Sequence, residues 1–135
     1  MSLELEAALR LLLASVLGAV IGFQRERAHK PAGLRTHILI CLGSALFTVV
    51  SIMGFTGPVD PSRVAAGVVT GIGFLGAGVI FRGMRGENHV IGLTTAASIW
   101  VTAAIGIAAG AGLYIIASAV AAVTVAVLFI PRVKG

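Results

Sequence analysis

Five long apolar stretches follow one another along the chain, and they constrain its fold more than any other feature. Each contains 18 to 20 residues: 5–23, 38–55, 64–81, 90–109 and 113–130. About 20 helical residues cross a hydrocarbon core roughly 30 Å thick. Lipid offers no hydrogen-bond partners to exposed backbone groups, so such a stretch crosses as a helix. The sequence therefore predicts an all-α integral membrane protein, with five transmembrane helices in a single domain over residues 1–135.

The composition argues against a water-soluble domain. Only 11% of the residues are charged and 58% are hydrophobic, whereas a soluble domain carries about 25% charged residues. The net charge of +5 would suggest nucleic acid in a soluble protein, but these basic residues occupy short loops between apolar stretches. We therefore expect no nucleic-acid partner, and we expect the loops to contact anionic membrane lipids.

The positions of the basic residues predict the orientation in the membrane. Eight fall on one side of a five-helix arrangement, and only Arg10 and Arg63 fall towards the other. The positive-inside rule makes the first side cytoplasmic, with the N-terminus outside and the C-terminus inside. A four-helix alternative, with residues 90–109 re-entrant or in the interface, would move two of the eight outside. The eight are Arg25, Arg27, Lys30, Arg35, Arg82, Arg85, Arg132 and Lys134.

A short internal repeat predicts a duplicated hairpin. Leu17-Gly18-Ala19 matches Leu75-Gly76-Ala77 at an offset of 58, and Gly33-Leu34 matches Gly92-Leu93 at an offset of 59. Helices one and three run in the same direction, so the two hairpins would form a parallel repeat. Chance similarity in a chain rich in Gly, Ala and Leu is the alternative; the shared register favours duplication.

Glycines at short spacing mark the third stretch. Residues 71–76 spell G-x-G-x-x-G, but no strand precedes them, so a dinucleotide site is not expected. Small residues let membrane helices approach closely, which is the predicted role; a bend that lines a cavity is the alternative. Gly18 with Gly22, and Gly106 with Gly110, have a similar four-residue spacing. The predicted packing residues are Gly67, Gly71, Gly73, Gly76 and Gly78.

A basic cluster between the first two stretches gives the main ligand-binding candidates. It is either a topogenic loop beside anionic headgroups or an anion site, with Glu26 orienting the arginines at the start of the second helix. In the fourth and most polar stretch, Thr94 and Thr95 either bond to a neighbouring helix or line a polar path. The candidates are Arg25, Glu26, Arg35, Thr36, His37, Thr94 and Thr95.

Asp60 and Arg63 form a predicted pair on the outer face, which Arg10 could join. Capping of the third helix by Asp60-Pro61-Ser62 is the ordinary interpretation, and a gate or substrate contact is the alternative.

Several kinds of chemistry lack support in the sequence. All five acidic residues lie near the ends of the stretches, and Mg²⁺ prefers carboxylates, so a Mg²⁺ pore within one subunit is not expected. The histidines are scattered and Cys41 is the only cysteine, so we expect no metal site and no internal disulfide. No catalytic constellation or cofactor motif is recognisable, and we do not expect an enzyme.

Four motifs occur in order along nearly the whole chain: Lys30-Pro31-Ala32-Gly33-Leu34-Arg35-Thr36-His37, Asp60-Pro61-Ser62-Arg63, Gly71-Ile72-Gly73-Phe74-Leu75-Gly76-Ala77-Gly78 and Gly92-Leu93-Thr94-Thr95-Ala96-Ala97. Together they resemble the membrane domain of the MgtC/SapB family. The resemblance implies a multi-pass protein of the bacterial inner membrane, associated with growth at low magnesium and, in some pathogens, with survival inside host cells. Many members carry a cytoplasmic ACT-like domain after the last span; this chain stops at Gly135, so we expect the transmembrane domain alone. Some members have Asn at the position of Thr94 and Cys at that of Val101.

Three functional hypotheses follow. The first is a transport-related or transport-regulating bundle with a cytoplasmic anion or lipid site. The second is an interaction module that binds other membrane proteins through its glycine faces. The third is a cation channel between subunits, which needs rings of Asp60 or Glu26. A bundle of 13.7 kDa has little interior, so we expect a homo-oligomer.

Overall fold

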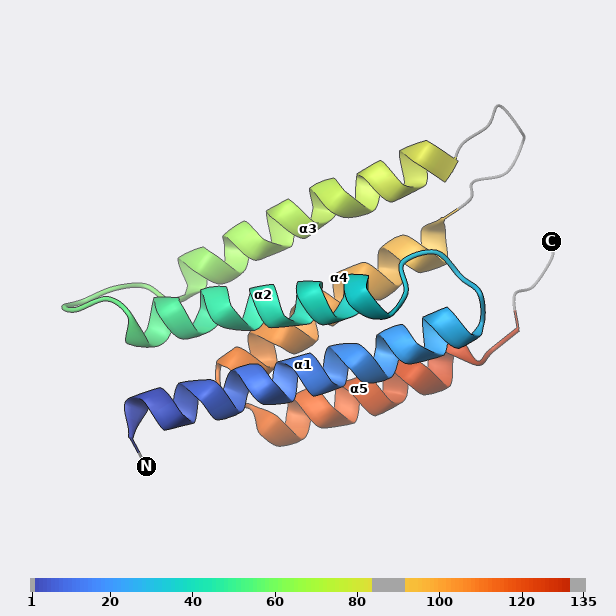
Figure 1. Ribbon diagram of the computed structural model, residues 1–135. Helices are drawn as coiled ribbons and strands as arrows, with labels where there is room; N and C mark the ends of the chain where they lie inside the picture. Colours follow the sequence, from blue (N-terminus) through green and yellow to red (C-terminus); the bar gives the residue numbers. More distant parts are fainter. Residues whose placement is uncertain (1, 84–91, 132–135) are drawn as a thin grey trace.

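A computed structural model describes residues 2–83 and 92–131, and these residues form five α-helices and no strand. Successive helices run antiparallel, so the N-terminus and the end of α5 lie at opposite ends of the bundle (Figure 1). The prediction of an all-helical protein is confirmed. The helices are α1 (Leu3–Arg27), α2 (Leu34–Met53), α3 (Ser62–Gly83), α4 (Leu93–Gly110) and α5 (Tyr114–Leu128).

The first four helices, of 18 to 25 residues, are long and apolar enough to cross a membrane. Helix α5 has 15 residues and therefore rises about 22 Å at 1.5 Å per residue, less than a hydrocarbon core of about 30 Å. The fifth crossing and the orientation thus stay predictions. Of the loop charges that bear on them, Arg85, Glu87, His89, Arg132 and Lys134 lie outside the described residues.

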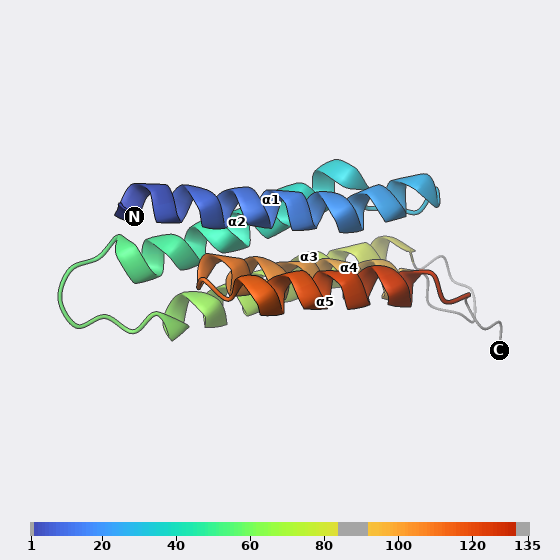
Figure 2. The ribbon, with the colours of Figure 1, turned by 90° about the horizontal axis from the view of Figure 1, so that it is seen from below.

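The helices form two layers. The hairpin of α1 and α2 packs against a layer of α3, α4 and α5, with α4 in the middle (Figure 2). In the most apolar 18-residue window of each helix, 56% of α4 is buried but only 11% of α3. The most polar stretch is therefore the most enclosed helix, because its hydroxyl groups find partners in the bundle rather than in lipid.

Helix α2 is held between two glycine faces. A Cβ atom at Gly18 of α1 would lie 2.6 Å from the carbonyl oxygen of His37, and one at Gly110 of α4 would lie 2.6 Å from that of Ala45. Gly22 and Gly106 contact α2 as closely from the same two sides. These positions require glycine because the opposing atoms are backbone, which cannot rotate away.

Helix α3 departs from the predicted packing. Within the described residues, Gly76 alone approaches another helix, with a Cβ position 3.6 Å from that of Ala96, and the other four glycines face open space. The reason is that α3 contacts α4 along one edge and diverges from α2. An apolar groove of about 640 Å³ separates α2 from α3. Its lining includes Leu39, Gly43, Phe47, Gly67, Gly71 and Leu75.

Contacts at equivalent positions relate the two hairpins. Gly18 meets His37 in the first hairpin, and Gly76 meets Ala96 in the second, which are the pairs that the offsets of 58 and 59 equate. The correspondence is in keeping with a duplicated hairpin, although the duplication itself stays a prediction.

Replacing Gly18 by leucine should destabilise the bundle by about 1–3 kcal/mol, because the added side chain must push α1 away from α2. Gly73→Leu is the matched control, since its Cβ position is open and leucine favours a helix over glycine. Unfolding of both variants in detergent, followed by circular dichroism, checks the prediction. Equal stability of the two variants would contradict it.

Candidate functional site

A buried arginine lies at the end of the bundle where α1 turns into α2. Arg25, in the last turn of α1, is only 3% exposed. Its Nη2 donates to the carbonyl oxygen of Pro31 at 2.9 Å and to the hydroxyl of Thr95 on α4. Its Nε atom has no hydrogen-bond partner among the described residues. No described carboxylate forms an ion pair with it either.

Glu26 lies elsewhere than predicted. Its carboxylate accepts the backbone N–H of Leu34 at 3.3 Å and so covers the N-terminus of α2. Within the described residues it forms no ion pair with Arg25 or Arg35. The expected orientation of the arginines by Glu26 is therefore not observed, because the free N–H groups at the start of α2 attract the carboxylate instead.

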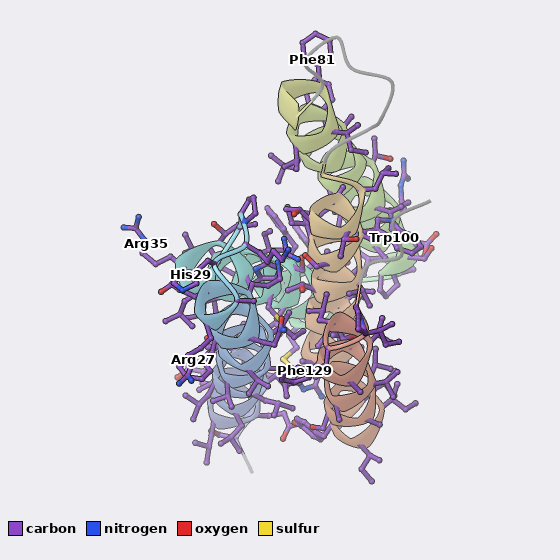
Figure 3. The ribbon with its side chains drawn as sticks, turned by 90° about the vertical axis from the view of Figure 1, so that its right-hand side faces the viewer. Arg27, His29, Arg35, Phe81, Trp100 and Phe129 are labelled. Atoms are coloured by element: carbon purple, nitrogen blue, oxygen red, sulfur yellow. The ribbon has the colours of Figure 1, made fainter. Side chains whose placement is uncertain are left out.

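The other basic residues of the cluster point outward. Arg35 and Thr36 are exposed, and Arg35 extends away from the bundle (Figure 3). The guanidinium of Arg27 lies 5.7 Å from the ring centre of Phe23 on the outer surface of α1. The predicted cluster thus divides into a buried part around Arg25 and a surface part that faces the surroundings.

Beside Arg25, a polar network joins α2 to α4. His37 is fully buried; its Nδ1 lies 3.0 Å from the carbonyl oxygen of Gly33 and its Nε2 lies 3.0 Å from the hydroxyl of Ser98. The Ser98 hydroxyl donates to the carbonyl oxygen of Thr95 at 2.8 Å, and Thr95 bonds to Arg25. The network was only partly predicted. Its signal in the sequence is the spacing of Thr95, Ser98 and Thr102, which places all three on one helical face.

A pocket of about 740 Å³ opens beside this network, between α1, α4 and the end of α5. Its polar side carries Arg25, Lys30, Thr94 and Thr95, and its apolar side is formed by the last residues of α5. The exposed Thr94 thus belongs to the pocket rather than to a helix contact. The full lining is Gln24, Arg25, Ala28, Lys30, Pro31, Gly92, Thr94, Thr95, Val127, Leu128, Phe129, Ile130 and Pro131.

The N-terminus of α4 faces the same pocket. The helix begins after Gly92, whose φ of +93° suits glycine, and no side chain caps it within the described part of the chain. The first N–H groups of a helix lack intrahelical partners and carry partial positive charge. Two sources of positive potential, the buried guanidinium and this helix end, therefore meet in one pocket.

At the opposite end, the predicted pair of Asp60 and Arg63 is not observed. The Ser62 hydroxyl and backbone N–H donate to the Asp60 carboxylate at 2.6 and 3.0 Å and hold its pKa below the ordinary value. Asp60 thus caps α3, which is the ordinary interpretation of the sequence. Arg10 bonds to Glu6 at 3.2 Å and to the carbonyl oxygen of Gly110 at 2.9 Å, which ties α1 to α4.

The described residues contain no group of three or more His, Cys, Asp or Glu side chains placed to hold a metal ion. Cys41 is a free, buried thiol.

Comparison with known proteins identifies the family. A family model described as the MgtC family matches residues 11–134. The chain belongs to the MgtC family. Membership and the four long apolar helices together make it a multi-pass membrane protein.

The relatives are considerably longer than the matched region. The "Putative magnesium transporter YhiD" of Escherichia coli (strain K12) is 53% identical over 81% of this chain and 53% of its own length. Protein SrpB of Synechococcus elongatus is 48% identical over 78% of this chain and 63% of its own length. Protein MgtC of Brucella abortus is 52% identical over 74% and 40%. The chain thus spans about half the length of these relatives. No solved structure matches it.

Replacing Thr95 by valine should lower the free energy of unfolding by about 1–3 kcal/mol, because Arg25 loses a buried acceptor. Thr94→Val is the matched control, since the side chain of Thr94 is exposed. Unfolding in detergent measures both variants. A Thr95→Val protein as stable as the control would show that the bond to Arg25 contributes little.

Proposed function

We propose that this protein is a transport-related or transport-regulating component of the bacterial inner membrane, and that its pocket at Arg25 binds a phosphate group. The group belongs either to the headgroup of an anionic lipid or to a free anion. The observation that carries the proposal is a buried guanidinium with no carboxylate partner among residues 2–83 and 92–131. Burying an unpaired charge costs several kcal/mol, so a counter-charge from outside the chain would stabilise it.

The geometry of the pocket supports an anion in particular. Arginine binds phosphate through charge-assisted hydrogen bonds, and Arg25 lines the pocket. The N-terminus of α4, which no described side chain caps, adds backbone N–H donors, and Lys30 adds a second positive charge. The apolar wall from α5 would accept the glycerol or acyl part of a lipid.

The name of the Escherichia coli relative refers to magnesium transport, which supports a role in magnesium supply. A pocket lined by Arg25 and Lys30 repels a divalent cation, so we do not place Mg²⁺ there. The pocket would then either regulate this role in magnesium supply or bind an anion that accompanies the magnesium. The chain resembles proteins that are associated with growth at low magnesium and with survival inside host cells, and both of these interpretations of the pocket agree with that association.

Replacing Arg25 by glutamine should weaken phosphate binding at least about tenfold, because a charge-assisted hydrogen bond is worth about 1.5–3 kcal/mol. Arg35→Gln is the matched control, and it should change affinity by less than about twofold because Arg35 faces outward. The measurement is calorimetric titration of protein in phosphatidylcholine nanodiscs with inorganic phosphate or sulfate, compared with nanodiscs that contain phosphatidylglycerol.

Binding of inorganic phosphate or sulfate in the titration identifies a free anion. Binding that is detected only when the nanodiscs contain phosphatidylglycerol identifies a lipid. Lys30→Gln, which leaves the buried network intact, should weaken binding to a smaller extent. If folded wild-type protein binds neither source, or if Arg25→Gln and Arg35→Gln bind equally well, the proposal is wrong.

A second proposed role is association with another copy of the chain, or with another membrane protein, through α3. In this chain every glycine on the facing sides of α1 and α4 contacts α2, whereas Gly67 and Gly71 line an apolar groove with no neighbour among the described residues. Small residues with this spacing let a further helix approach closely. We expect a homo-oligomer that uses this groove.

Gly71→Leu should reduce the oligomeric fraction because the side chain fills the groove. Gly73→Leu should not, since Gly73 lies outside the groove lining. Native mass spectrometry in mild detergent and cross-linking in lipid measure the fraction. A strictly monomeric wild-type protein in both media would rule out the homo-oligomer.

A further inference from the structure

The hydrogen-bond chain through His37 has three contacts, and with a neutral histidine there are too few protons for all of them. Three contacts lie in series: Gly33 O to Nδ1 at 3.0 Å, Nε2 to Ser98 Oγ at 3.0 Å, and Ser98 Oγ to Thr95 O at 2.8 Å. The carbonyl oxygens at both ends can only accept. The Ser98 hydroxyl supplies one proton and a neutral imidazole supplies one, so two protons serve three contacts. All three are satisfied only when the ring carries a proton on each nitrogen.

The burial of the ring opposes that second proton, and the positive charge of Arg25 adds to the effect. Thr95 connects the two groups, because its hydroxyl bonds to Arg25 and its carbonyl oxygen accepts from Ser98. Like charges repel strongly where little water screens them. Among the described residues, Glu26 on α1 already covers the start of α2, and Cys41 is a buried thiol one turn further along α2. Helix α4 faces the ring with uncharged Ser98 and Thr95.

We infer that His37 is a proton-binding site linked to the anion pocket: the imidazole takes up one proton when an anion neutralises Arg25, and it releases that proton when the anion leaves. The inference rests on the proposed anion site and states how that site responds to pH. The proton forms an N–H bond on the ring, its source is water or buffer, and no other bond changes. Linkage is reciprocal, so a lower pH strengthens anion binding.

The wild-type protein provides the first test, which needs no variant. Sulfate serves as the soluble probe and phosphatidylglycerol as the lipid probe, because neither changes its charge between about pH 5.5 and about pH 7.5, the range in which histidine titrates. Calorimetry in buffers of different ionisation enthalpy gives the number of protons taken up per anion bound. We expect a value between zero and one, and an affinity that rises by up to about tenfold per pH unit as the pH falls.

Two variants locate the proton. His37→Gln should abolish both the proton uptake and the pH dependence while leaving some anion binding. His29→Gln is the matched control, because His29 is an exposed residue of the loop between α1 and α2, and it should behave as the wild type does. If His37→Gln does not fold, Ser98→Ala removes the partner of Nε2 and should reduce the uptake.

Nitrogen-15 spectra of the His37 ring report how many ring nitrogens are protonated. In a histidine with only a structural role, this number would not change when the anion binds. We expect one protonated ring nitrogen without anion at about pH 7.5 and two with saturating probe. Anion binding without proton uptake, and with the ring unchanged, overturns this inference and leaves the anion site standing. Absence of binding by either probe overturns the anion site and the linkage together.

Discussion

Close contact between the backbone of α2 and the glycine faces of α1 and α4 is the constraint on which the rest of the structure depends. In lipid, apolar side chains gain little by meeting one another, so helices associate where their surfaces fit closely. Gly18 on one side of α2 and Gly110 on the other leave room for nothing larger than hydrogen. This contact holds α2 between α1 and α4 and leaves α3 at the margin of the bundle.

The same contact encloses the polar side chains of α4. Once α4 lies against α2, Ser98 reaches His37 and Thr95 reaches Arg25 of the neighbouring α1. A buried polar group is costly unless it is hydrogen-bonded, so the three helices become interdependent at this end. In the part of the chain that the structure describes, the guanidinium of Arg25 is left incompletely satisfied, and Arg25 borders the pocket. The proposed function and the proposed proton linkage both follow from this incompletely hydrogen-bonded guanidinium.

The two hairpins use their helix N-termini differently. At the start of α2 the Glu26 carboxylate accepts a backbone N–H, so this helix end has its anion within the chain. At the start of α4, the equivalent position in the predicted repeat, no described side chain takes that place. Within the described residues, the start of α2 is thus covered by a carboxylate and the start of α4 is not. The positive potential at the start of α4 is available to a ligand.

The sequence by itself determined the all-helical fold and the approximate bounds of the five helices, because apolar stretches of this length follow directly from the need to satisfy backbone groups in lipid. It also identified Arg25, His37 and Thr95 as candidates and the pairs Gly18/Gly22 and Gly106/Gly110 as contact surfaces. It could not separate buried Arg25 from exposed Arg35, or show that the α3 glycines mostly face outward. Only the tertiary structure decided these points, since helical periodicity places residues on a face but does not say which helix, if any, covers that face.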